Sequence, residues 1–171
     1  MEKTAIVPGS YDPVTAGHME VIRSAAGIFD HVYAVILDNS EKSRSMFTAE
    51  QKLEILECAI NALKDEGIEN VGARLYSGLT VDAARELGAG FVVKGVRSPT
   101  DFDYEYGMAE ITRRFDSSLQ TVFIPSTPQM SCVSSTYVRE IIKYAGKESG
   151  DFAKGTYDTI MRIYKSNNEK I

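Results

Sequence analysis

Residues Val7 to His18 read VPGSYDPVTAGH and contain the end of a predicted strand, a turn and the start of a predicted helix. Apolar residues lead into Gly9-Ser10, and Asp12-Pro13 is a dipeptide typical of turns. His18, one of only two histidines in the chain, stands where the helix is expected to begin. The stretch predicts a strand–turn–helix unit whose polar residues either shape the turn or belong to a nucleotide site.

The size and composition of the chain indicate one soluble globular domain. Its 171 residues are 43% apolar and 25% charged, enough for a full hydrophobic core. The net charge of -5 argues against general nucleic-acid binding, which needs a basic face. A small polyanionic ligand is compatible with this charge if the basic residues cluster locally.

The sequence also bears on where the protein is found. No run of about 18 apolar residues is present, so we expect no membrane span. The N-terminal MEKTAIVPG lacks a basic segment followed by an apolar stretch, so we expect no signal peptide. Cys58 and Cys132 have neither metal-site nor disulfide-framework spacing. We therefore expect a cytoplasmic protein with reduced thiols.

Short apolar runs alternate with helical patterns along the chain. The alternation predicts an α/β fold: a Rossmann-like, doubly wound, five-stranded parallel sheet with helices on both faces. The strands are expected at 5–7, 32–37, 71–75, 91–93 and 121–124. Helices are expected from the apolar stripe at 21–29, from a capping box at Thr48–Gln51, over 81–87, over 104–115 and after Ser134-Ser135. The whole of 1–171 is expected to form a single domain, with 146–171 as a C-terminal helical tail.

Polar and basic residues follow four of the five predicted strands. In doubly wound sheets ligands bind outside the carboxyl ends of the strands, so these loops are expected to share one rim. Cations together with hydroxyl donors and helix N-termini form the combination that binds phosphate groups. The residues are Ser10 and His18; Asn39, Lys42 and Arg44; Lys94, Arg97, Asp101 and Glu105; and Ser134, Ser135 and Thr136.

Several of these residues have a structural alternative. His18 lies at the positive end of a helix, which favours a neutral imidazole that can donate to phosphate, but it is equally explained by backbone or core contacts. Lys42 and Arg44 lie in DNSEKSRS, a charged loop of the kind that is usually only solvated. Asp101 and Glu105 lack an obvious basic partner, and Asp101 is explained by helix capping.

Other site types are not supported. Neither the dinucleotide-binding glycine fingerprint nor a P-loop is present, so phosphate must be bound by another arrangement. Cys132 has no adjacent histidine to activate it as a nucleophile. The Ser134–Thr136 run predicts a helix N-cap, with or without a terminal phosphate bound there.

Four motifs together resemble the bacterial phosphopantetheine adenylyltransferases of the nucleotidylyltransferase superfamily. They are GSYDPVTAGH, NSEK before MFT, VVKGVRSPTDFDYE and VSSTYVRE, in the family's order and spacing over residues 3 to 145. Thr15 favours this branch, because related adenylyltransferases tend to have H-x-G-H where this chain has Thr15-Ala-Gly-His18.

The resemblance implies a reaction in which the phosphate of 4′-phosphopantetheine attacks the α-phosphorus of ATP. Dephospho-coenzyme A forms and pyrophosphate leaves, without a covalent enzyme intermediate. Mg²⁺ would be bound mainly through the ATP phosphates. A homohexamer is implied as well, with no nucleic-acid or membrane partner.

The resemblance also implies roles for individual residues. The catalytic residues would be His18, Lys42, Ser10 and Arg97. The acceptor would be bound by Ser10, Lys42, Leu79, Thr80 and Lys94. ATP would be bound by Ser10, Tyr11, His18, Gly95, Val96, Arg97, Glu105, Met130, Ser131, Cys132, Val133, Ser134, Ser135 and Thr136.

Three departures from the family pattern bear on these roles. Lys94 stands where the family usually has Arg, which keeps the charge but loses the bidentate fork. The loop after Lys42 is one residue longer, so Arg44 competes with Lys42 for the place of the catalytic lysine. Thr136 replaces a common Ser and preserves the hydroxyl. Two alternatives to the function stay open: a nucleotidylyltransferase with another phosphate acceptor, and a regulatory nucleotide-binding module without catalysis.

Overall fold

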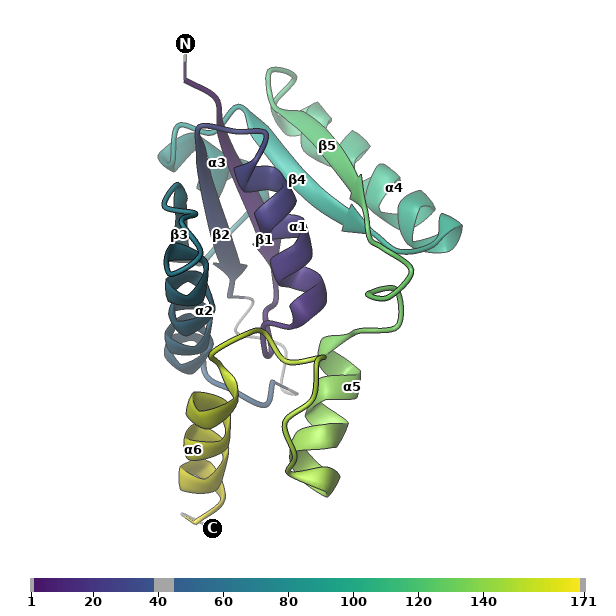
Figure 1. Ribbon diagram of the computed structural model, residues 1–171. Coiled ribbons are helices and arrows are strands. Elements are labelled where there is room, and N and C mark those ends of the chain that lie inside the picture. The colour runs from purple at the N-terminus through teal and green to yellow at the C-terminus, as the bar shows by residue number, and fades with distance from the viewer. Residues whose placement is uncertain (1, 39–44, 170–171) are drawn as a thin grey trace.

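The computed structural model describes residues 2–38 and 45–169, and its centre is a five-stranded parallel sheet (Figure 1). The strands lie in the order β3-β2-β1-β4-β5. Their bounds are β1 (Thr4–Gly9), β2 (His31–Leu37), β3 (Val71–Tyr76), β4 (Phe91–Val96) and β5 (Gln120–Pro125). Ala5 of β1 pairs with Val32 on one side and with Phe91 on the other. The predicted parallel sheet is confirmed.

Helices cover both faces of this sheet because the chain winds outward from β1 in two directions. The first face carries α1 (Ala16–Ala26) and α2 (Ala49–Lys64), and the second carries α3 (Thr80–Glu86) and α4 (Pro99–Phe115) (Figure 1). Successive β1 side chains point to opposite faces, so Val7 packs with α1 and α2 whereas Ile6 packs with Ala83 and Ala84 of α3. The strand order reverses between β1 and β4, which places the ligand crevice at the ends of these two strands.

The C-terminal segment returns along the first face. It consists of α5 (Ser135–Glu140), the π-helical turn η1 (Ile141–Ala145) and α6 (Tyr157–Asn168). Helix α6 lies against α2, with Ile160 and Ile163 buried and Gln51 Nε2 donating to Asn167 Oδ1 at 3.0 Å. The predicted amphipathic tail therefore contributes to the core of the domain. Within the described part of the chain, no helix is both long and apolar enough to cross a membrane.

Several element boundaries differ from the sequence predictions by one or more residues, and three of these differences have a clear physical reason. Helix α1 ends at Ala26 before Gly27, so Phe29 is buried beyond the helix rather than on its apolar face. The sequence predicts that strand β4 ends at Val93, before Lys94 interrupts the apolar run. It continues to Val96 because the backbone pairs with β5 whether or not the side chain is apolar. Helix α4 begins at Pro99 because the Ser98 hydroxyl accepts the Asp101 N–H at 3.2 Å, which makes Ser98 the cap instead of Asp101.

We predict that Gly95→Ala destabilises the protein. A Cβ at this position would lie 2.6 Å from Cγ2 of Val21, a buried and stiff side chain of α1. Overpacking of this kind costs about 1–3 kcal/mol of unfolding free energy, measurable by urea denaturation. Gly107→Ala in α4 is the matched control, because the added methyl group would have no neighbouring atom within 4 Å and the helix gains propensity. Equal stability of the two variants would contradict the predicted clash.

Candidate functional site

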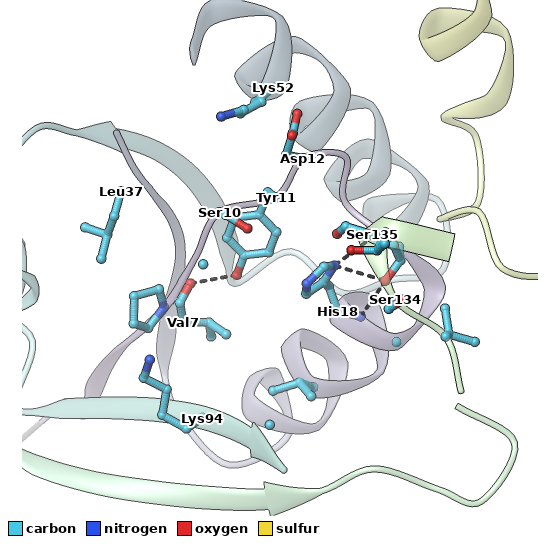
Figure 2. Close-up of a pocket in the computed structure, with 18 of the residues that line it drawn as sticks. Val7, Ser10, Tyr11, Asp12, His18, Leu37, Lys52, Lys94, Ser134 and Ser135 are labelled. Atoms are coloured by element: carbon cyan, nitrogen blue, oxygen red, sulfur yellow. Dashed lines mark hydrogen bonds between the residues drawn. The ribbon is translucent and has the colours of Figure 1, made fainter. Parts of the chain in front are cut away.

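A cavity of about 1030 Å³ opens at the carboxyl ends of β1 and β4 (Figure 2). Its walls come from the β1–α1 turn, the starts of α2 and α5, and α4. Twelve residues assigned to the site from sequence line it. They are Ser10, Tyr11, His18, Thr80, Lys94, Gly95, Arg97, Glu105, Val133, Ser134, Ser135 and Thr136.

Other predicted site residues are not in this lining. Five described residues lie elsewhere: Leu79, Val96, Met130, Ser131 and Cys132. Leu79 precedes α3 and is exposed, and Cys132 is an exposed free thiol. Asn39, Lys42 and Arg44 lie outside the described residues, so the choice between Lys42 and Arg44 stays a prediction.

The lining also includes residues that the sequence analysis did not assign to the site. Lys52 and Arg139 add two cations, and Thr15 and Asp12 lie beside His18 and the turn. Lys52 could have been found from sequence, since it stands three and four residues before Ile55 and Leu56 on the buried side of α2. No such pattern marks Arg139, because its partner Asp12 lies far away along the chain.

The Thr15 and His18 side chains form a reciprocal cap at the start of α1. The Thr15 backbone N–H donates to His18 Nδ1 at 3.0 Å, and the His18 N–H donates to Thr15 Oγ1 at 3.4 Å. Nδ1 is thus an acceptor, so the neutral ring carries its proton on Nε2. The ring also packs edge-to-face on Tyr11, with centroids 5.0 Å apart, and Tyr11 is fixed by a 2.7 Å bond from its hydroxyl to the Val7 carbonyl.

His18 is neutral at physiological pH. Burial, and secondarily the nearby Arg97 guanidinium, lower its pKa from the ordinary 6.5 to about 4. The sequence predicted a neutral ring from the field of the helix terminus, but the causes in the structure are desolvation and Arg97. A neutral imidazole whose Nε2–H has no acceptor among the described residues is a hydrogen-bond donor that stays unprotonated on Nδ1 at pH 7.

Two cations from β4 and its following loop are paired with carboxylates of α4. Lys94 Nζ lies 3.1 Å from Glu105 Oε2, and Arg97 Nε lies 3.6 Å from Asp101 Oδ2. The expectation that Asp101 and Glu105 lack basic partners is therefore wrong. The error arose because β4 and α4 bring together residues that the sequence assigned to one continuous loop.

The hydroxyls at the start of α5 make contacts within the protein. Ser134 is the N-cap and accepts the Tyr137 N–H at 3.2 Å, as its predicted capping role requires. Ser135 Oγ donates to the Pro13 carbonyl at 2.8 Å, and Thr136 Oγ1 accepts from Arg139 at 2.9 Å. These bonds fix the start of α5 against the β1–α1 turn, beside His18 (Figure 2).

The Asp12 carboxylate joins three segments around the cavity. It is buried and accepts the backbone N–H groups of Met46 and Phe47 at 3.0 and 3.1 Å. Arg139 Nη1 of α5 lies 3.7 Å from Asp12 Oδ2 and donates to the Asp12 carbonyl at 2.6 Å. Asp12 thus has the structural role that the turn dipeptide predicted, and it fixes α5 and the segment before α2 as well.

The described residues that line the cavity do not form a protein metal site. Asp12, Asp101 and Glu105 are each engaged with a cation. Among residues 2–38 and 45–169, no group of three or more His, Cys, Asp or Glu side chains is placed to hold a metal ion.

Comparison with known proteins identifies the family. The family model described as cytidylyltransferase-like matches residues 6–141. A phosphopantetheine adenylyltransferase from Lachnoclostridium phytofermentans is 41% identical over 169 residues, and the match covers 98% of each chain. The chain belongs to the phosphopantetheine adenylyltransferase family. A phosphopantetheine adenylyltransferase from Rubrobacter xylanophilus, 40% identical with 98% coverage of both chains, agrees. The predicted family, a family of nucleotidyltransferases, is confirmed.

Solved structures show the same fold at much lower identity. A bifunctional NMN adenylyltransferase/ADP ribose pyrophosphatase from Francisella tularensis superposes with a TM-score of 0.68 at 16% identity. The match covers 99% of this chain and 54% of that protein, so the chain spans about half of its length. The same Francisella protein complexed with AMP and a manganese ion gives a TM-score of 0.67 at 16% identity. The Rossmann-like fold of this phosphopantetheine adenylyltransferase family member is thereby confirmed.

We predict that His18 titrates far below an ordinary histidine. Because its folded pKa is about 4, the unfolded chain binds more protons between pH 4 and 6.5. The contribution of His18 to stability is therefore fully present above about pH 6.5 and is lost as the pH falls toward 4. NMR titration of the ring signals measures this, with His31→Gln removing the other imidazole. A His18 midpoint at or above 6.5 would exclude the partly buried, neutral ring.

Proposed function

We propose that this protein transfers the adenylyl group of ATP to 4′-phosphopantetheine, giving dephospho-coenzyme A and pyrophosphate. Two relatives that match over nearly their full length carry the name of this enzyme. The cavity lies at the ends of β1 and β4, where the strand order reverses. It supplies cations and hydrogen-bond donors on an otherwise acidic chain, as two polyanionic substrates require.

The neutral His18 is the single observation that carries this proposal. It lines the cavity beside Arg97, with its Nδ1 already occupied by Thr15. The Nε2–H is then the only polar hydrogen of the ring, and it is oriented before substrate binds. A preorganised donor of this kind stabilises the charge that develops on the α-phosphate during transfer. Arg97 adds a positive charge on the same side.

The proposed reaction is a direct in-line displacement. A phosphate oxygen of 4′-phosphopantetheine forms a bond to the α-phosphorus of ATP, and the bond from that phosphorus to the bridging oxygen of pyrophosphate breaks. No enzyme nucleophile is needed because the acceptor phosphate is one. Catalysis then consists of positioning by Ser10, Lys94 and Arg97 and of charge stabilisation by His18.

A divalent cation, Mg²⁺ in this proposal, would be held mainly by the ATP phosphates. The related Francisella structure contains AMP and a manganese ion, which supports the use of a divalent metal. Three of the four described cavity carboxylates, Asp12, Asp101 and Glu105, are paired with cations, so with Asp38 alone unpaired the described lining offers no complete ligand set. When bound, the ion would supply neutralisation of phosphate charge.

The assembly is proposed to be a homohexamer in the cytoplasm. Helix α4 has no buried residue in the single chain, and Ile111 and Phe115 are 47% and 61% exposed. A helix with this many exposed apolar side chains marks a protein interface. A second copy of the chain is the natural partner for such a surface in a small symmetric enzyme.

We predict product formation from one acceptor only. Purified protein incubated with ATP and a panel of phosphorylated acceptors should give dephospho-coenzyme A from 4′-phosphopantetheine, detected by mass spectrometry. Adenylylation of a different acceptor would exclude the proposed substrate. Tight ATP binding without turnover would indicate the regulatory module instead.

His18→Ala should lower turnover by about 100-fold or more, the usual effect of removing one transition-state donor. The matched control is His31→Ala, which removes the same side chain from an exposed position on β2. Circular dichroism checks that both variants fold. Near-normal turnover of His18→Ala would refute the role of His18.

The oligomer prediction is tested by light scattering during size-exclusion chromatography. The expected mass is six times the 18.9 kDa of one chain. Ile111→Asp should reduce this mass, whereas Ile28→Asp, at an exposed position after α1, should leave it unchanged. A wild-type mass of one chain would contradict the proposed assembly.

A further inference from the structure

Lys52 is a buried lysine whose position is not explained by packing. Only 8% of the residue is exposed, although lysine is almost never fully buried unless it is paired. It lies on the same side of α2 as the buried Leu56, Ala59 and Leu63. An apolar residue would extend this buried stripe, so the charge at this position needs another explanation.

The other basic side chains of the cavity are each neutralised by a carboxylate. Lys94 pairs with Glu105 at 3.1 Å, Arg97 with Asp101 at 3.6 Å and Arg139 with Asp12 at 3.7 Å. Within residues 2–38 and 45–169, no carboxylate forms an ion pair with Lys52 Nζ, and no side-chain hydrogen bond from it is formed. Of the four basic Lys and Arg side chains in the lining, Lys52 is therefore the one without an ion pair among the described residues, although the Asp38 carboxylate also lines the cavity.

The Lys52 side chain lines the cavity and reaches into it. In the view of Figure 2 its amino group points toward the side on which Leu37 lies and away from His18, Ser134 and Ser135. An uncompensated cation in a partly desolvated cavity attracts an anion strongly, because the charge is poorly hydrated and poorly screened. The missing counter-charge is thus expected to enter with a ligand.

We propose that Lys52 binds the phosphate of the acceptor, and that it does not bind ATP. In an in-line displacement the acceptor approaches the α-phosphorus from the side opposite the leaving pyrophosphate. His18, Arg97 and the start of α5 form one side of the cavity, and the family resemblance assigns the residues of this side to ATP. Lys52 comes from α2 and points away from that side, so its charge meets the incoming phosphate. This inference rests on the proposed function, because it assigns a residue to one of its two substrates.

The uncompensated charge of Lys52 should also affect the protein without ligand. A buried charge without a partner makes the ligand-free protein less stable. Replacing it by an uncharged residue of similar length removes this destabilisation. Lys52→Met should therefore leave the thermal unfolding midpoint of the ligand-free protein equal to or above that of the wild type. A purely structural lysine would give a lower midpoint in the same variant.

The kinetic test compares Lys52→Met and Lys52→Arg with the wild type, varying each substrate at saturation of the other. Lys52→Met should raise KM for 4′-phosphopantetheine about 10-fold or more, the effect of losing one charge-assisted hydrogen bond. KM for ATP, and ATP affinity by calorimetry, should stay within about twofold of the wild type. Lys52→Arg, which keeps the charge, should restore most of the lost acceptor affinity.

Lys64→Met is the matched control, since Lys64 lies on the same helix but is exposed at its far end. It should change neither KM. An equal change in both KM values, no change in either, or a lower unfolding midpoint for Lys52→Met would overturn the role of Lys52. Failure of the wild type to form dephospho-coenzyme A would instead refute the proposed function. In that case, the affinities of the wild type and of Lys52→Met for 4′-phosphopantetheine, measured by calorimetry, would still test the role of Lys52.

Discussion

The buried Asp12 carboxylate holds together the segments from which the cavity is built. It accepts two backbone N–H groups from the segment before α2 and lies against Arg139 of α5. The β1–α1 turn, the start of α2 and the start of α5 are far apart in sequence, and a single side chain fixes their relative positions. If Asp12 moved away, Arg139 and the two backbone N–H groups would lose their partner, which costs free energy. The arrangement is therefore expected to be rigid. The geometry around His18 depends on that rigidity.

His18 takes part in the cap of α1 and, in the proposed function, is also the hydrogen-bond donor to the substrate. The capping box satisfies the free N–H groups at the start of α1, and it also leaves Nε2–H as the ring donor. Burial lowers the pKa of the ring and keeps it neutral, while Arg97 contributes positive charge nearby. In the proposed function, the structural and functional explanations of His18 are therefore not alternatives, because the cap would orient the donor.

The charge distribution explains how an acidic protein can bind polyanions. Three of the cavity cations are held by carboxylates of α4 or of the β1–α1 turn, which fixes their positions and moderates their charge. Lys52 differs because α2 supplies it without a carboxylate partner among the described residues. Net charge gave no indication of this arrangement, since it describes the whole surface and not one cavity.

Local sequence was enough to predict the succession of strands and helices along the chain, the parallel sheet and the helix caps at Thr48 and Ser134. It also indicated the loops after β1, β4 and β5 that line the cavity. These features depend on periodicity and on residues close together along the chain. The folded chain was needed to show that Asp101 and Glu105 pair with Arg97 and Lys94, that Arg139 reaches Asp12, and that Lys52 faces the cavity. Thr15, which in the sequence only marked the family, became the residue that fixes the tautomer of His18. Ion pairs and burial depend on distances between elements, and these distances exist only after the sheet has brought the ends of its strands together.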